Sequence, residues 1–367
     1  RARYQGQAMP GAEALRRANI EPMTLSYKEG LALINGTSVM TALAACHVVA
    51  AKNLIKAHTL AACLTLEVLK AKIMPFHPAA HRQKPHPGQI RIADAIYTTL
   101  ADSKMIVQDR QVEAWLRKMA SDEPRGLDEQ IEDAYSIRAT PQVLGPVLDT
   151  TLFVEQTVTT ELNSSNDNPL IVVEEGEAIH NANFHGQYIS NGMDQLAIVL
   201  VTLCNLSERR SNRLLHPSLN GDLPPFLCAS NPGMSQGLMG GQFMATSLTA
   251  ELRHTAAPIS IQSLPSTGDF QDHVSFGLVA ARRTRDTLVD ARRIVAYELI
   301  CAAQAADIRG IDGLSSSTRM LYGMVREHVP YLDHDEPLTD YIEAVAALFE
   351  SGALLDALPE ECDGYDW

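Results

Sequence analysis

Apolar residues recur at helical spacing over long stretches of this 367-residue chain. The longest such stretch begins after Gly36, where Thr37 or Ser38 can cap a helix, and it continues to Ile73 before Pro75 ends it. Because its apolar positions cover more than one face, we expect a helix buried inside a bundle.

Further helices are predicted between the prolines and glycines that interrupt the pattern. We expect them at 12–18, 89–102, 109–120, 128–138, 142–161, 187–215, 234–256, 272–306 and 338–356. A short strand is predicted at 1–7, and a β-hairpin where 170–173 and 178–180 flank a turn at Gly176. The pattern predicts an all-α fold, a long antiparallel helical bundle with irregular polar loops and one short β-hairpin. We divide it into a helical core at 1–330 and a C-terminal helical tail at 331–367.

Composition and charge narrow the class of protein. Hydrophobic residues make up 46% and charged residues 20%, which is enough for a sizeable core and excludes disorder. Lys and Arg total 30 against 44 Asp and Glu, a net charge of −14. This balance argues against a nucleic-acid partner and against a polybasic membrane patch. No consecutive apolar run reaches the roughly 18 residues that span a bilayer.

The number and spacing of the cysteines indicate the cellular compartment of the protein. The six cysteines are scattered and form no CxxC pair, which is typical of reduced, mostly buried thiols in a cytoplasmic protein. The chain begins at Arg1 instead of a methionine, so we expect a targeting segment or a whole N-terminal region outside the given sequence.

One candidate site combines Glu132, Tyr135 and Arg138. On the helix predicted there, steps of three residues place a carboxyl, a phenol and a guanidinium on one side. The guanidinium could hold a substrate carboxylate with two parallel hydrogen bonds, and the phenol could relay a proton. The alternative is a solvated ion pair with a packed tyrosine ring.

A second candidate is Asn35, which stands just before the long helix and next to Gly36. Helix N-termini attract anions, and an amide offers both a donor and an acceptor. The alternative is an ordinary turn and cap.

Two amide-rich loops flank the predicted hairpin, at 161–169 and 181–186. So many amides are costly to bury unless they bond one another or a ligand. The alternative is a polar surface loop.

The segment 268–273 precedes another long helix. Phe270 and Gln271 could line a pocket with an apolar contact and a hydrogen bond, or Asp269 or Asp272 could simply cap the helix. The histidines of the loop at 75–88 do not predict a metal site, because Pro78 breaks the spacing and no cysteine or carboxylate lies nearby.

Taken in order, five segments resemble the aromatic amino acid ammonia-lyase and 2,3-aminomutase family, which includes histidine, phenylalanine and tyrosine ammonia-lyases. They are Lys28-Glu29-Gly30-Leu31-Ala32-Leu33-Ile34-Asn35-Gly36-Thr37, Asp133-Ala134-Tyr135-Ser136-Ile137-Arg138 with Pro141-Gln142, Asn166-Asp167-Asn168-Pro169, Asn183-Phe184-His185-Gly186 and Gln271-Asp272-His273-Val274-Ser275.

The resemblance implies an electrophilic prosthetic group, 4-methylideneimidazole-5-one (MIO), which the family makes from an internal Ala-Ser-Gly or Thr-Ser-Gly. Neither tripeptide occurs in this sequence. The chain therefore resembles the C-terminal two thirds of a family member, with the prosthetic group and a lid tyrosine that serves as base in the part upstream. No metal is implied.

The resemblance also implies roles for individual residues. Arg138 holds the substrate carboxylate and Asn35 assists. Tyr135 lies beside the prosthetic group, and Phe184 packs against both the group and the substrate. Family sites draw residues from several subunits, so a homo-oligomer, a tetramer, is implied.

At three positions the resemblance also implies which substrate is preferred. Glu132 stands where histidine lyases carry Gln, as in the aryl-specific members, and Gln271 replaces a Glu that histidine lyases use on the imidazole. Phe270 makes the ring pocket more apolar. We therefore expect phenylalanine first and tyrosine second, converted to an arylacrylate, a β-aryl-β-amino acid, or both.

Two other classes compete with this interpretation. The fumarase and aspartase lyases also use long helical bundles, but their mobile Ser-Ser loop is absent, since Ser164-Ser165 leads into Asn-Asp-Asn-Pro. A non-catalytic helical scaffold would not need Tyr135, Arg138 and Asn35 together.

Overall fold

The computed structural model describes residues 1–108, 132–230, 233–359 and 362–367. They form two compact units, the first made of Arg1–Thr37 and Ser164–His185, and the second of Ser38–Asn163 and Gly186–Trp367. The helix expected at 109–120 and the start of the one at 128–138 lie outside the described residues. The expected boundary near 330 stays a prediction; the described residues beyond it belong to the second unit.

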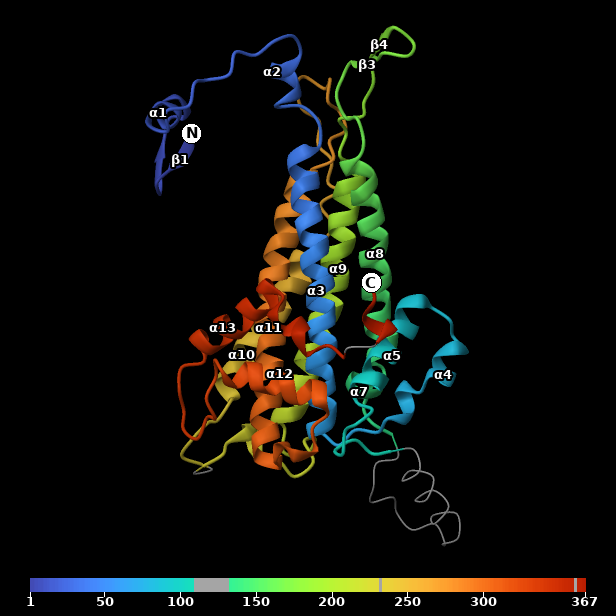
Figure 1. The fold of residues 1–367 in the computed structure, drawn as a ribbon, viewed down its shortest axis with the longest axis vertical. Coiled ribbons are helices and arrows are strands. Elements are labelled where there is room, and N and C mark those ends of the chain that lie inside the picture. Colours follow the sequence, from blue (N-terminus) through green and yellow to red (C-terminus); the bar gives the residue numbers. More distant parts are fainter. Residues whose placement is uncertain (109–131, 231–232, 360–361) are drawn as a thin grey trace. The chain divides into compact units, whose positions relative to one another are not determined.

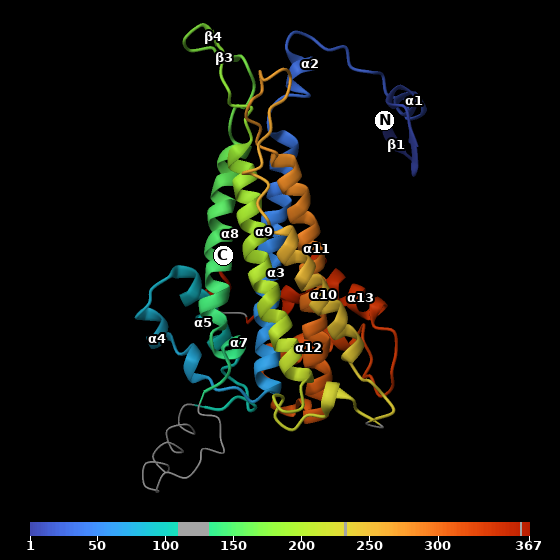
Figure 2. The same cartoon turned by 180° about the vertical axis from the view of Figure 1, so that it is seen from behind.

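Long helices packed side by side form the second unit, as Figure 1 shows. They are α3 (Ser38–Val68), α8 (Thr140–Leu162), α9 (Gln187–Leu215), α10 (Met239–Thr255) and α11 (Gly277–Arg309). Helices α3, α9 and α11 run in one direction, and α8 and α10 run in the other (Figure 2). Their facing apolar side chains make one continuous core, so the predicted bundle is confirmed.

The central helices have the length and composition of membrane spans. Helices α3 and α9 are both long and apolar enough to cross a bilayer, although no consecutive apolar run suggested it. A core helix of a bundle meets the same two criteria, since it is surrounded by other helices. Helix α3 also ends earlier than expected, because Lys70 turns the chain with a left-handed φ of 52°.

The bundle interior contains a fully buried ion pair. Arg210 donates to both carboxylate oxygens of Glu298, at 2.5 and 2.9 Å. Thr65 and Ser207 donate to the same carboxylate, at 3.0 and 2.6 Å, and the Arg210 guanidinium also contacts His58 Nε2 at 2.8 Å. Burial holds the pKa of His58 well below its ordinary value, so a neutral imidazole accepts this bond. The pair joins α3, α9 and α11.

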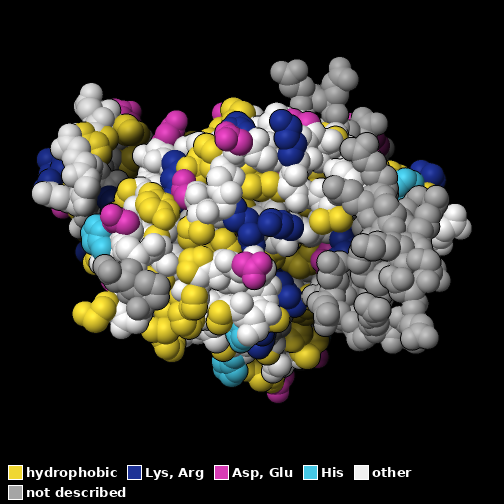
Figure 3. All heavy atoms as spheres, turned by 90° about the horizontal axis from the view of Figure 1, so that it is seen from below, with side chains coloured by type: hydrophobic (Ala, Val, Ile, Leu, Met, Phe, Trp, Pro, Cys, Tyr) yellow, Lys and Arg dark blue, Asp and Glu magenta, His cyan; other side chains and the backbone are white. Residues whose placement is uncertain are grey.

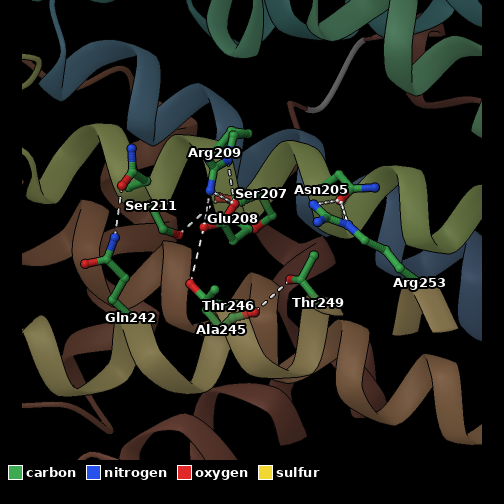
Figure 4. A network of polar contacts seen from close by, with 11 residues as sticks. Asn205, Ser207, Glu208, Arg209, Ser211, Gln242, Ala245, Thr246, Thr249 and Arg253 are labelled. Carbon is green, nitrogen blue, oxygen red and sulfur yellow. Dashed lines mark hydrogen bonds and ion pairs between the residues drawn. The ribbon is translucent and has the colours of Figure 1, made fainter. Parts of the chain in front are cut away.

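A second polar network joins α9 to α10 nearer the surface (Figure 4). Arg253 donates to Asn205 at 2.7 Å, and Thr246 donates to Glu208 at 3.4 Å. Glu208 also pairs with Arg209 on its own helix. These contacts fix α10 along α9.

Shorter helices cover the bundle. They are α4 (Pro78–Arg82), α5 (Pro87–Thr99), α7 (Tyr135–Arg138), α12 (Ser316–Arg326), α13 (Thr339–Ser351) and the single turns η1 (Met74–Phe76), η2 (Pro225–Leu227), η3 (Ile311–Gly313), η4 (Ala353–Ala357) and η5 (Asp363–Tyr365). Neither α4 nor α12 was predicted, and neither were the single turns η1, η2, η3 and η5. Pro78 opens α4 instead of breaking it, because the first helical turn tolerates proline, and Ser315 caps α12 by accepting from the Thr318 N–H.

The first unit contains two hairpins. The strand predicted at 1–7 is a hairpin in which β1 (Ala2–Tyr4) pairs with β2 (Gln7–Met9). Short helices α1 (Gly11–Arg17) and α2 (Glu29–Ala32) follow. The hairpin predicted around Gly176 is confirmed, with β3 (Leu170–Val172) antiparallel to β4 (Glu177–Ile179).

The described cysteines form no disulfide bonds. All six cysteines are free thiols, of which Cys63, Cys204, Cys228 and Cys301 are buried. Within the described ranges, no three His, Cys, Asp or Glu side chains are grouped to hold a metal ion.

Candidate active site

Helix α7 carries Tyr135 and Arg138 and is fixed at both ends. Asp133, just before the helix, accepts from the backbone N–H of Lys72 at 2.8 Å and pairs with its ammonium at 3.5 Å. Ile137 points into the core, and Thr140 donates to its carbonyl at 2.9 Å. The one helical turn between these anchors therefore holds its two polar side chains in a defined place.

Arg138 contacts both of the other candidate side chains of this segment. Its guanidinium pairs with Glu132 at 2.6 Å and lies 5.0 Å from the centre of the Tyr135 ring, a cation–π distance. Its Nε is buried and has no hydrogen-bond partner in the part of the chain that the structure describes. Its side chain is 29% exposed, and Tyr135 is 74% exposed. A partly buried guanidinium with a donor to spare is suited to receive a carboxylate.

The helix expected at 128–138 is wrong over 132–134. Glu132, Asp133 and Ala134 are not helical, and Ala134 is extended with φ −62° and ψ 159°. The bond from Asp133 to the chain after α3 holds them outside the helix. Glu132 still reaches Arg138, so the predicted grouping of carboxyl, phenol and guanidinium holds although the helical spacing behind it does not.

Asn35 lies in the first unit, within a network of charges and amides. The Asp167 carboxylate is bonded by the Lys28 ammonium at 2.7 Å, by the backbone N–H of Asn168 and by the Asn35 amide. The Lys28 bond is the largest cause that lowers the pKa of Asp167 below its ordinary value. Gly36 follows with φ 91°, and a Cβ there would lie 2.8 Å from the Asn166 side chain. Lys28 and Asp167, which belong to the motif segments but were assigned no role from the sequence, therefore orient Asn35.

The amides of the two flanking loops bond one another. Asn166 donates to the Thr37 hydroxyl at 2.8 Å, the backbone N–H of Asn181 donates to the Asn168 side chain at 2.9 Å, and the N–H of Asn183 donates to the Asn181 side chain at 2.7 Å. This network shapes the loop that leads to Phe184, which is half-buried.

Phe270 and Gln271 lie in the loop before α11. Ser266 and Gln271 exchange backbone hydrogen bonds across a tight turn in which Gly268 and Asp269 take φ of 62° and 63°. The turn leaves Phe270 89% exposed. The expected cap by Asp269 or Asp272 is wrong, because α11 starts only at Gly277, after this turn.

The two site segments of the second unit lie at its opposite ends, as Figures 1 and 2 show. The loop with Phe270 precedes α11, whose 33 residues span about 50 Å at the usual helical rise. Arg309, at the far end of α11, bonds the Val68 carbonyl just before the chain reaches Lys72 and its contact with Asp133. One copy of this unit therefore does not bring Arg138 and Phe270 together.

The comparisons with known proteins agree on one family. The family model described as aromatic amino acid lyase matches residues 1–327. The tyrosine ammonia-lyase of Cupriavidus metallidurans is 45% identical over 356 residues, covering 96% of this chain and 67% of that protein. The histidine ammonia-lyase of Geobacillus kaustophilus is 41% identical over 346 residues, covering 94% of this chain and 65% of that protein.

Solved structures give the same result. The phenylalanine aminomutase of Pantoea agglomerans superimposes with a TM-score of 0.91 and 53% identity, over 94% of this chain and 67% of that one. The chain thus spans about two thirds of the length of the relatives it matches. The segments that shape this site are part of a longer family architecture, and the chain belongs to the aromatic amino acid lyases, a family of enzymes.

Proposed function

We propose that this chain is the larger part of an MIO-dependent enzyme acting on an aromatic L-amino acid, with phenylalanine as first substrate and tyrosine as second. The enzyme eliminates ammonia to give an arylacrylate, or moves the amine to the β-carbon to give a β-aryl-β-amino acid. It works as a cytoplasmic homotetramer.

The observation that carries the proposal is the arrangement around Arg138. An amino acid zwitterion presents a carboxylate and an ammonium, and the Arg138–Glu132 pair presents the two complementary charges 2.6 Å apart. The buried, unbonded Nε gives the guanidinium a second donor for a bidentate contact with the carboxylate. The exposed Tyr135 phenol lies beside it and is placed to hold or pass a proton.

The described residues fit a neighbouring prosthetic group of the MIO kind. Such a group, once formed, supplies an electrophilic carbon that turns the amine nitrogen into a leaving group. Tyr135, an exposed phenol on a fixed helix, would lie against it. Asn35, an amide bonded to Asp167, would assist in holding the substrate carboxylate. The chain's own residues bind the carboxylate, orient the substrate and hold the proton.

Assembly of several copies accounts for two features of the second unit. A complete site requires a copy that contributes its Phe270 end and another that contributes its Arg138 end. The long helices also expose large apolar side chains that a partner would cover. Figure 3 shows the molecule from below, where hydrophobic side chains also lie between charged groups. Those exposed on the helices include Val39, Val49, Phe153, Tyr188, Ile198, Phe243 and Val289.

The side chains that we expect to face the aryl ring favour phenylalanine over the alternatives. Phe270 offers an apolar surface, and the Gln271 amide is neutral, so neither attracts an imidazolium. A para-hydroxyl would need a polar partner, and of the three side chains expected at the ring only Gln271 could supply one, so tyrosine is the second candidate.

Product analysis tests the proposal. Full-length protein is incubated with L-phenylalanine, L-tyrosine and L-histidine, and products are separated by chiral chromatography. We expect cinnamate or β-phenylalanine as the fastest-formed product, with tyrosine products slower. Cinnamate alone identifies a lyase and β-phenylalanine a mutase. Urocanate as the main product would contradict the proposal.

A further inference from the structure

A pocket of about 490 Å³ lies in the second unit between the start of α10, α11 and the segment that leads into α13. Figure 2 shows these elements next to one another. Its floor is apolar and consists of Met244, Leu248, Leu338 and Ile342, which pack on or belong to the core. Pockets of this volume bind small molecules, and this floor can bury a small apolar body.

Hydrogen bonds tie the walls of the pocket to one another. The Asp335 carboxylate accepts from the backbone N–H groups of Gln236 and Gly237, all at 2.9 Å. Arg293 of α11 donates to Glu343 of α13 at 2.8 Å. The pocket is therefore formed in advance, and a ligand would not have to order it.

Gly240 leaves the pocket open. Its neighbour Gly241 is required by packing, because a Cβ there would lie 2.2 Å from the Tyr297 ring. A Cβ at Gly240 would meet no atom within 4 Å among the described residues. Gly240 is the second residue of α10, and packing gives no reason for a glycine at this position. What Gly240 provides is free space in the pocket wall.

The charge of the side chains that line the pocket indicates the charge of the ligand. Three carboxylates line it, those of Asp335, Glu336 and Glu343, against one guanidinium, that of Arg293, so the lining charge is 1 − 3 = −2. The guanidinium is already paired with Glu343 and with Asp290, the latter at 3.0 Å. Glu336 also pairs with His334 at 3.0 Å and accepts from the Tyr341 hydroxyl, and the bond to Asp333 is the largest cause that raises the pKa of His334. Because Asp333 and Asp290 offset the charges of His334 and Arg293, the mouth stays negative, attracts cations and repels carboxylates.

From the apolar floor, the open wall and this charge, we propose that the pocket binds a small arylalkyl primary amine. The apolar body occupies the space beside Gly240, and the ammonium faces the carboxylates at the mouth. This site is separate from the proposed active site, which needs the substrate carboxylate, and it does not depend on the proposed function.

Calorimetric titration with 2-phenylethylamine tests the proposal on the full-length protein. Gly240→Leu fills the pocket and should weaken binding by about tenfold or more. Gly323→Leu is the matched control, because Gly323 is also helical and its added Cβ also meets no described atom within 4 Å. It should leave the affinity unchanged, and thermal melting confirms that both variants fold.

Two further measurements complete the test, one on the charge of the ligand and one on the oligomeric state of the protein. Glu343→Gln should weaken the amine, and 3-phenylpropionate, which has a similar body and the opposite charge, should not bind. The proposal is overturned if 2-phenylethylamine shows no saturable binding, if Gly240→Leu binds it as well as the wild type, or if 3-phenylpropionate binds equally tightly. A changed oligomeric state of Gly240→Leu in light scattering would assign the pocket to a protein segment and would also overturn it.

Discussion

Replacing Arg138 by alanine removes the group on which the proposed substrate contact depends. The guanidinium is partly buried, stacked on Tyr135 and able to make two charge-assisted hydrogen bonds to a carboxylate. Hydrogen bonds to charged groups contribute about 1.5–3 kcal/mol each, and the existing pair with Glu132 must be weakened to form them. We therefore expect a net loss of about 3 kcal/mol, which lowers kcat/KM by roughly 150-fold.

The assay is steady-state turnover of L-phenylalanine by the full-length enzyme. The loss should fall mainly on KM, because the carboxylate contact exists before and during the reaction. Arg138→Lys keeps a charge but not the fork, and we expect an intermediate loss of about tenfold. Arg285→Ala is the control, since Arg285 is exposed and pairs with its neighbour Asp286. A kcat/KM for Arg138→Ala within threefold of wild type would refute the carboxylate contact.

Three further predictions concern stability. Arg210→Met leaves the Glu298 carboxylate buried without its partner and should cost about 3–5 kcal/mol in urea unfolding. Gly88→Ala places a Cβ 2.3 Å from the Gly145 carbonyl at the crossing of α5 and α8, and should lower Tm by several degrees. Asp167→Asn should remove an acid-sensitive contribution to stability. The folded-state pKa of Asp167 is lowered, so its contribution to stability is complete above the ordinary pKa of an aspartate and is lost as pH falls through the lowered pKa. The urea midpoints of the wild type and of Asp167→Asn, measured between about pH 2 and 6, should therefore differ most near pH 6.

Each of these three predictions has a control variant or a result that would contradict it. A double variant that adds Glu298→Leu to Arg210→Met should be more stable than Arg210→Met alone, since it removes the stranded charge. Gly323→Ala, whose Cβ meets no described atom within 4 Å, should leave Tm unchanged or raise it slightly. An Asp167→Asn variant whose urea midpoint follows pH as the wild type does would show that Lys28 does not hold this carboxylate in solution.

Long helices were predictable because their signals are local. Apolar spacing and the breaks at proline and glycine placed α3, α8, α9 and α11 within a few residues of their observed bounds. The errors fall where a distant contact decides the backbone. Asp133 holds its segment out of a helix through a bond to Lys72, 61 residues away, and no local pattern encodes that bond.

The candidate site was predictable in its chemistry but not in its arrangement. Glu132, Tyr135 and Arg138 do come together, and the family motifs selected Asn35. No local pattern indicated that the Phe270 loop lies at the other end of the unit from Arg138, because that placement follows from the directions of helices packed in three dimensions. It is the reason for proposing a site shared between copies.

Subunit complementation tests that shared site most directly. Full-length Arg138→Ala and Phe270→Asp, each expected to be nearly inactive alone, are co-expressed in equal amounts with different tags, and mixed oligomers are isolated. If the two residues come from different copies, about a quarter of the sites in a random mixture regain both native residues, and turnover of L-phenylalanine returns in that proportion. If mixed oligomers stay as inactive as either variant alone, the site is not shared in this way.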